Sequence, residues 1–157
     1  MDRREAEVAT ENWLKDQGYV TRRAVRTQWQ KVDFFGADVM GKRKEGTVYI
    51  QTTTSQRPEQ VRVRRRKLEV VPWNPLDRVL LFEVEERPNV VNRRKKDLFF
   101  RVHQYEGDIL TASIRLERTR KEPIPFNPEV HVKRVREWKV LPEPIPILPE
   151  MLRVRKG

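Results

Sequence analysis

The stretch TVYIQTTT, residues 47–54, determines our prediction of the fold. Its residues favour β-structure, and in a strand Val48 and Ile50 face one way while Gln51 and Thr53 face the other. A strand that looks buried therefore directs an amide and a hydroxyl toward the same side. Asp38, in the apolar stretch FFGADVM, lies thirteen residues before Gln51. The pattern indicates two neighbouring strands that bring these polar side chains to a shared site.

The rest of the chain divides into helices and strands around this stretch. Apolar residues at helical spacing predict a helix over residues 2–17, ended by Gly18. Pro58 suits the first turn of a second helix that runs to about Val70. Further strands are expected at residues 19–27, 31–40, 78–86, 98–105 and 109–116, and the last two are joined by the turn EGD. This order predicts an α/β or α+β domain, with a mixed β-sheet flanked by helices.

The composition changes after residue 116. Seven of the eleven prolines lie from Pro123 onward, mixed with lysine and arginine. We therefore expect a domain over residues 1–116, followed by an extended, Pro-rich, basic arm over residues 117–157. The apolar residues of this arm would pack against a partner subunit while its basic residues reach DNA; they are Phe126, Val130, Val135, Trp138 and Leu141.

Charge and composition restrict the class of protein. Lysine and arginine number 34 against 23 acidic residues, a net charge of +11, which favours a polyanionic partner such as nucleic acid. The absence of cysteine excludes disulfides and thiolate metal sites. The N-terminus has no apolar signal region and no apolar run approaches 18 residues, so we expect no membrane span and a location in the cytoplasm, or in the host cytoplasm if the source is viral. The 36% of charged residues is compatible with a thermophilic source.

The polar residues on the predicted strands are suitable ligands for a hard divalent cation. The Asp38 carboxylate, the Gln51 amide oxygen and the Thr52 carbonyl would converge on Mg²⁺, with Mn²⁺ expected to substitute. On the first helix, Glu7 and Glu11 share a stripe that can face the sheet. Glu11 is therefore an alternative ligand, and Asp33 is another if a bulge at Gly36 shifts the strand phase.

With these residues in place, the sequence resembles the PD-(D/E)XK nuclease superfamily, and within it the archaeal-type Holliday junction resolvases and their phage relatives. The resemblance covers roughly residues 3–85. In those enzymes a helical Glu comes eleven residues before a Gly-aromatic pair, as Glu7 does before Gly18-Tyr19. Their strand Asp comes thirteen residues before a Glu-x-Lys, as Asp38 does before Gln51. A second resemblance is to phage and bacterial proteins reading roughly D-x-x-G-x-x-D…VQVTS, in which the lysine position is likewise lost.

The resemblance implies a restriction-endonuclease-like core in which Glu7, Asp38, Gln51 and Thr53 occupy the catalytic positions. Glu7 and Asp38 would inherit the metal-ligand role, with Glu7 as a ligand or as the group that positions the base. Gln51 in place of Glu removes one negative charge, and Thr53 in place of Lys removes a cation. Arg66 or Lys67 of the following helix is the expected replacement for that cation. The helix carries five basic residues that we expect to contact DNA phosphates, namely Arg62, Arg64, Arg65, Arg66 and Lys67.

The expected function is that of a Mg²⁺-dependent endodeoxyribonuclease that resolves four-way junctions. A homodimer with two sites would match the two-fold symmetry of branched double-stranded DNA. Three alternatives stay open. The first alternative is a nuclease of the same fold that acts on DNA ends or linear duplex. The second is a non-catalytic nucleic-acid-binding protein on a decayed nuclease scaffold. The third is an RNA-binding protein.

Overall fold

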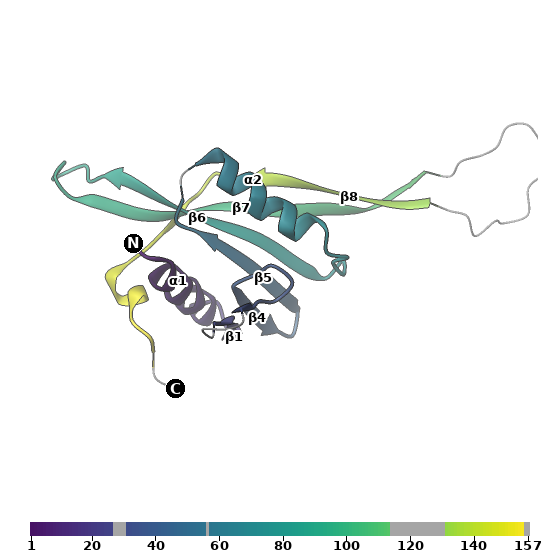
Figure 1. Ribbon diagram of the computed structural model, residues 1–157, viewed down its shortest axis with the longest axis horizontal. Coiled ribbons are helices and arrows are strands. Elements are labelled where there is room, and N and C mark those ends of the chain that lie inside the picture. Colours follow the sequence, from purple (N-terminus) through teal and green to yellow (C-terminus); the bar gives the residue numbers. More distant parts are fainter. Residues whose placement is uncertain (27–30, 56, 114–130, 156–157) are drawn as a thin grey trace, which may run out of the picture.

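A computed structural model describes residues 1–26, 31–55, 57–113 and 131–155 of the chain. It is a mixed α/β structure in which a curled, mixed sheet is flanked by helices (Figure 1). The helical elements are α1 (Arg3–Asp16), α2 (Pro58–Glu69) and the 3₁₀ turn η1 (Pro149–Leu152). The strands are β1 (Val20–Arg23), β2 (Val25–Arg26), β3 (Lys31–Val32), β4 (Val39–Arg43), β5 (Gly46–Thr53), β6 (Asp77–Pro88), β7 (Lys96–Ser113), β8 (His131–Val140) and β9 (Ile145–Pro146).

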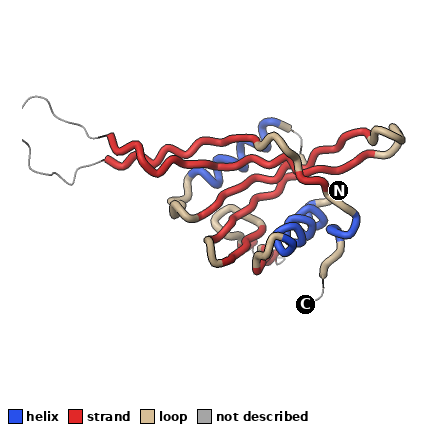
Figure 2. Tube along the Cα trace, turned by 180° about the vertical axis from the view of Figure 1, so that it is seen from behind, coloured by secondary structure: helices blue, strands red, loops and turns tan. Residues whose placement is uncertain are grey.

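The main sheet runs in the order β1-β4-β5-β6-β7-β8. β9 pairs with Phe99 and Phe100, a part of β7 that β8 does not reach. All pairs are antiparallel except β5 and β6, which are parallel because α2 carries the chain back between them. The register places Ile50 opposite Val39 and Thr53 opposite Glu83. Figure 2 shows the long β6 and β7 strands extending well beyond the shorter strands of the sheet. The separate pair β2 and β3 forms a small second sheet.

The helices cover opposite faces of the sheet, and each has its own apolar core (Figure 1). Val48 and Ile50 pack toward α1, whereas Tyr49 packs toward Leu68 of α2. This confirms the alternation predicted for residues 47–54. The core on the α1 side is the larger of the two; its fully buried members include Leu14, Phe82 and Phe100.

The first helix begins and ends where local signals predict. Asp2 caps it, since its side chain accepts a hydrogen bond from the Glu5 amide at 2.8 Å while Glu5 reaches back to the Asp2 amide. Gly18 follows the helix with a φ of 87°, in the left-handed region that favours glycine. None of the helices in the described ranges is long and apolar enough to span a membrane.

Two predicted elements are wrong. Residues 31–40 do not form one strand, because Phe35 and Gly36 both take a positive φ, of 55° and 91°, and turn the chain between β3 and β4. Residues 96–113 are one strand, so EGD is not a turn. Pairing with β8 continues through it, and a register shift between Asp108 and Thr111 absorbs the irregularity.

The C-terminal segment also differs from the expected extended arm. Residues 131–140 add a strand to the sheet, and Ile147 and Met151 are buried in the core beneath α1. Prolines do not prevent this, because Pro146 lies in a short edge strand and Pro149 opens the 3₁₀ turn. The Asn12 side chain fixes the segment by donating to the carbonyls of Met151 and Arg153, both at 2.8 Å. Residues 114–130, which include Phe126 and Val130 of the expected arm, lie outside the described residues.

Candidate functional site

A cluster of polar side chains lies where β5 ends, and three elements supply it. Glu7 comes from α1, Asp38 directly precedes β4, and Gln51 and Thr52 come from the end of β5. The Asp38 amide donates to the Ile50 carbonyl at 2.9 Å, which places Asp38 beside Gln51. The spacing of thirteen residues between Asp38 and Gln51 therefore brings the two side chains together, as the sequence predicts.

The Asp38 carboxylate is fully buried and accepts several hydrogen bonds. Its Oδ2 accepts from Gln51 Nε2 at 2.8 Å, from the Thr52 amide at 3.1 Å and from the Thr52 hydroxyl at 3.2 Å. Gln51 Nε2 also donates to the Thr52 carbonyl at 3.2 Å. The amide nitrogen thus lies between two of the oxygens predicted to bind Mg²⁺. Hydrogen bonds to the charged form offset the cost of burying this carboxylate.

Arg3, which was not among the predicted site residues, completes the cluster. Its Nη2 lies 3.3 Å from Asp38 Oδ1 and its Nε lies 3.7 Å from Glu7 Oε1, so one guanidinium joins both carboxylates. The Arg3 side chain is 36% exposed while that of Asp38 is 0% exposed, so the guanidinium covers the cluster on its solvent side. A basic residue four positions before Glu7 on a helix is the signal that predicts this contact.

The donor set would suit a divalent cation if the guanidinium were displaced from the two carboxylates. Two carboxylates and two neutral oxygens, the Gln51 amide and the Thr52 carbonyl, are the hard ligands that Mg²⁺ uses together with water. Gln51 would have to turn its amide so that Oε1 replaces Nε2. In the described part of the chain, no group of three or more His, Cys, Asp or Glu side chains forms a metal site. Any ion held here therefore depends on neutral oxygens.

The remaining predicted ligands lie elsewhere. Asp33 is exposed, and its Oδ1 accepts from the Gly36 amide at 3.2 Å, which closes the turn before β4. Glu11 pairs with Lys15 at 3.3 Å and with Arg23 at 3.4 Å. Each has a local structural partner and neither contributes to the Asp38 cluster.

Thr53 is buried and uncharged. Its hydroxyl accepts from the Ser55 amide at 3.2 Å. Arg66 and Lys67, the expected replacements, are exposed on α2, and neither contacts the cluster within the described residues. The cation at the cluster is Arg3 instead.

The basic residues of α2 fall into two groups. Arg62, Arg66 and Lys67 are exposed and free to meet a phosphate backbone. Arg64 and Arg65 are partly buried, and Arg65 packs on the sheet with its guanidinium 5.1 Å from the Trp138 ring. Of the five basic residues predicted to contact DNA, three therefore lie on the exposed side of α2 and two lie on the side that faces the sheet.

Arg65 also ends a chain of polar contacts across the sheet. It contacts His103 Nδ1, and His103 Nε2 lies 2.8 Å from Glu83 Oε2. Burial lowers the pKa of His103, and the nearby Arg65 charge acts in the same direction, against the hydrogen bond with Glu83. Burial likewise lowers the pKa of Arg65. The chain depends on the register of β6 against β7, which no local sequence signal reports.

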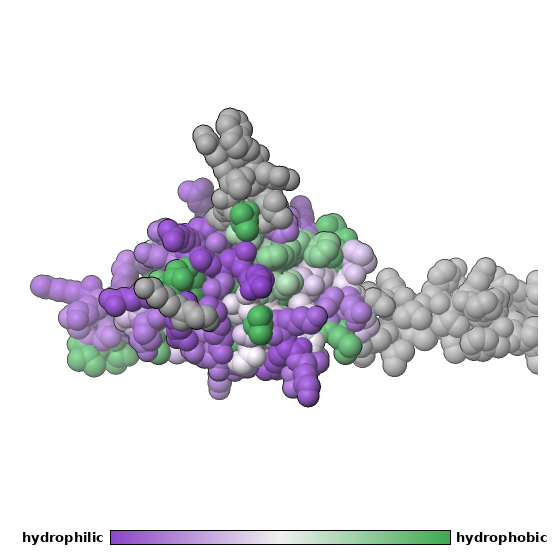
Figure 3. All heavy atoms as spheres, turned by 90° about the horizontal axis from the view of Figure 1, so that it is seen from below, coloured by the Kyte–Doolittle hydropathy of each residue, from purple (hydrophilic) through white to green (hydrophobic). Residues whose placement is uncertain are grey.

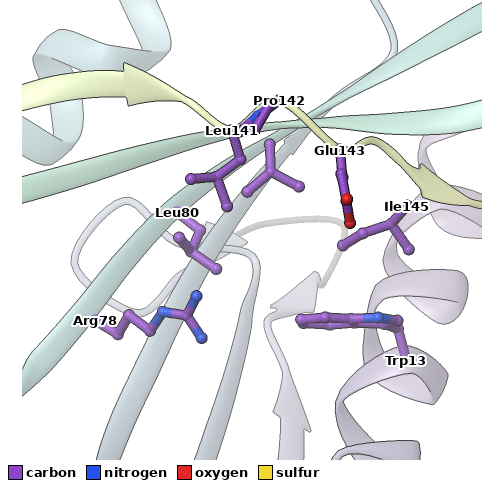
Figure 4. Close-up of a pocket in the computed structure, with 8 residues that line it drawn as sticks. Trp13, Arg78, Leu80, Leu141, Pro142, Glu143 and Ile145 are labelled. Carbon is purple, nitrogen blue, oxygen red and sulfur yellow. The ribbon is translucent and has the colours of Figure 1, made fainter.

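An apolar cavity of about 310 Å³ lies on the α1 side of the sheet (Figure 4). The Arg78 guanidinium and the Glu143 carboxylate point toward the space beside the Trp13 ring. Its lining residues are Trp13, Arg78, Leu80, Val102, Leu141, Pro142, Glu143 and Ile145. The cavity is near the start of β6, whereas the Asp38 cluster is level with Leu81 to Glu83, so the two are separate.

Comparisons with protein-family models, with curated proteins and with solved structures found no match to this chain.

Proposed function

We propose that this protein is a metal-dependent endonuclease that acts on branched DNA, built on a restriction-endonuclease-like core. The observation that carries the proposal is the convergence of Glu7, Asp38 and Gln51 from three different elements. Arg3 pairs with both carboxylates, and Gln51 donates to Asp38. The order α1, three antiparallel strands, α2 and a parallel strand supports the same core. The spacing of these residues along the chain supports it independently, through the resemblance to junction resolvases.

The chain's own residues have distinct tasks in this proposal. Asp38 and Glu7 would hold Mg²⁺ together with the Gln51 amide oxygen and the Thr52 carbonyl. The bound ion would polarise the scissile phosphate and lower the pKa of a water molecule. Arg3 leaves the carboxylates and offsets negative charge on the phosphate, the task that lysine has in the family.

The substrate follows from charge and from the family resemblance. The net charge of +11 and the exposed Arg62, Arg66 and Lys67 on α2 favour a phosphate backbone. α2 begins five residues after β5 ends, so its first turns lie at the same end of the sheet as Asp38. A four-way junction has two-fold symmetry and is cut in two strands, so a homodimer is the expected active form.

The test compares cleavage of a four-way junction, linear duplex and single-stranded DNA at matched ionic strength, with Mg²⁺ and with Mn²⁺. We expect junction cleavage in both metals, abolished by Asp38→Asn while junction binding persists. Asp33→Asn is the matched control, because Asp33 is exposed and closes a turn outside the cluster. Circular dichroism of both variants checks that they fold. Cleavage that survives in folded Asp38→Asn overturns the role of this residue, and equal cleavage of junction and duplex overturns the preference for branched DNA.

A second function is favoured by the bonding of Asp38 itself. Gln51, Thr52 and Arg3 already provide its carboxylate with donors, which suits a protein that keeps the scaffold and binds nucleic acid without cutting it. Tight junction binding with no cleavage in either metal would support this alternative. Stronger binding to structured RNA than to junction DNA would make RNA the ligand.

A further inference from the structure

The hairpin between β6 and β7 presents two valines to solvent at its tip. Val90 and Val91 are each 95% exposed, more than the other large hydrophobic residues in the described ranges. The hairpin projects from one end of the molecule (Figure 1), and at that end Figure 3 shows apolar atoms beside hydrophilic ones. Contiguous exposed apolar residues rimmed by polar ones can mark an interaction site.

Hydrogen bonds hold the tip in one shape. The Asn89 side-chain oxygen accepts from the amides of Val91 at 2.8 Å and Asn92 at 3.0 Å. Its side-chain nitrogen donates to both Asp97 carboxylate oxygens at 3.2 Å, and its backbone amide donates to the Lys95 carbonyl at 2.9 Å. The valines are therefore presented by a closed turn, which lowers the entropy cost of using them as contacts.

Cations surround the valines. Arg93, Arg94 and Lys95 are exposed, and none of them forms an ion pair with a described residue. Lys96 differs, because it pairs with Glu86 at 3.4 Å. The tip therefore combines two exposed valines with three positive charges that form no ion pair with a described residue. This composition suits a polyanion whose interior is apolar.

The position of the tip connects it to the Asp38 cluster. β6 runs parallel to β5, and Thr53, the last residue of β5, pairs with Glu83. β6 then continues to Pro88, so the hairpin reaches about 17 Å beyond the end of β5, at about 3.3 Å per residue. That distance corresponds to about five base steps at roughly 3.4 Å each. One nucleic acid can thus pass the cluster and meet the tip.

We propose that the tip is a wedge that inserts Val90 and Val91 between base pairs of a bound nucleic acid, while Arg93, Arg94 and Lys95 hold the flanking phosphates. Apolar side chains that enter a base step unstack it and bend the duplex, and the cost is lowest at a branch point, where stacking is already interrupted. Two valines offer too little apolar surface for a stable membrane anchor, which uses larger side chains along a whole helix face. The wedge rests on the proposed substrate class and not on hydrolysis.

The test uses junction and duplex DNA that carry 2-aminopurine at successive steps, bound in EDTA so that no strand is cut. Binding of the unaltered protein should raise fluorescence at one or two adjacent steps. The double variant Val90→Ser, Val91→Ser should lose this rise and bind about tenfold more weakly, with an unchanged salt slope. Arg93→Ala with Arg94→Ala should instead reduce the salt slope by about two and keep the fluorescence rise. Val70→Ser is the matched control, since Val70 is 81% exposed at the end of α2.

An unaltered protein that raises no fluorescence at any step overturns the wedge, and so does a rise that survives in the double valine variant. Binding to anionic vesicles that requires the valines, without a fluorescence change on DNA, overturns it in favour of a membrane contact. The two proposals fail separately. A fluorescence rise without metal-dependent cleavage removes only the nuclease, and cleavage without the rise removes only the wedge.

Discussion

Removing Arg3 should show whether the Asp38 cluster can bind a metal ion or only forms a structural ion pair with Arg3. Arg3→Ala deletes the contact at 3.3 Å with buried Asp38 and the weaker one at 3.7 Å with Glu7. A hydrogen bond to a charged group is worth about 1.5–3 kcal/mol, and partial exposure of Arg3 reduces this to about 1–2 kcal/mol. For a chain of this size, that loss lowers the Tm by roughly 2–8 °C.

Divalent metal should reverse the loss. In the proposed site the guanidinium and a metal ion would compete for the same two carboxylates, so deleting Arg3 should raise the apparent metal affinity by the same free energy, about 5- to 30-fold. If the variant then binds Mn²⁺ with a Kd of about 0.1 mM, about 10 mM Mn²⁺ stabilises it by about 2.7 kcal/mol. The unaltered protein should gain less from the same Mn²⁺ concentration.

Thermal unfolding by calorimetry, with and without Mn²⁺, measures both effects. Arg4→Ala is the matched control, because Arg4 is adjacent, exposed and forms no ion pair with a described residue. We expect Arg4→Ala to leave the Tm and its metal response unchanged. If Arg3→Ala is as stable as Arg4→Ala, the ion pair with Asp38 does not stabilise the fold. If Mn²⁺ stabilises Arg3→Ala no more than the unaltered protein, Arg3 does not compete with a metal ion.

Two further predictions concern stability. The pKa of His103 is lowered in the folded protein, so the unfolded chain binds more protons as the pH falls below the ordinary histidine pKa of about 6.5. The free energy of unfolding should therefore fall as the pH drops through this value. Denaturant titrations of His103→Gln between about pH 7 and 5 should show a flatter pH profile than the unaltered protein, and an unchanged profile would contradict this prediction. Gly18→Ala should cost about 1 kcal/mol, because φ is 87° although the space around Gly18 is open. Gly46→Ala should cost about 1–3 kcal/mol more, because φ is 148° and the added Cβ would lie 2.7 Å from the Leu76 carbonyl oxygen. Equal losses in urea unfolding would disprove the clash.

Much of the fold could be predicted from local patterns. The helix from Arg3 to Asp16 carries its own cap, and β5 is rich in β-favouring residues, so these elements form where the sequence indicates. The failures come from tertiary pairing. EGD has turn-forming residues, yet β8 supplies a partner strand that keeps it extended. Pairing between residues far apart in the chain overrides such local preferences.

The candidate site was predictable to a similar extent. The Asp38–Gln51 contact follows from two strands joined by a tight turn, because the register then depends only on spacing. The ion pair between Arg3 and Glu7 could also have been predicted, because the two residues are four positions apart on a helix. The chain from Arg65 through His103 to Glu83 was not, since it needs the register of three separate elements.

The clamp between Asn12 and the carbonyls of Met151 and Arg153 has a consequence for the order of folding. The Asn12–Met151 bond joins residues 139 positions apart, so the helix that carries Arg3 and Glu7 is fully packed only when the segment around Met151 has joined it. Contacts of such long sequence separation slow folding. During synthesis on the ribosome, α1 would therefore stay partly unpacked until Met151 and Arg153 have left the ribosome.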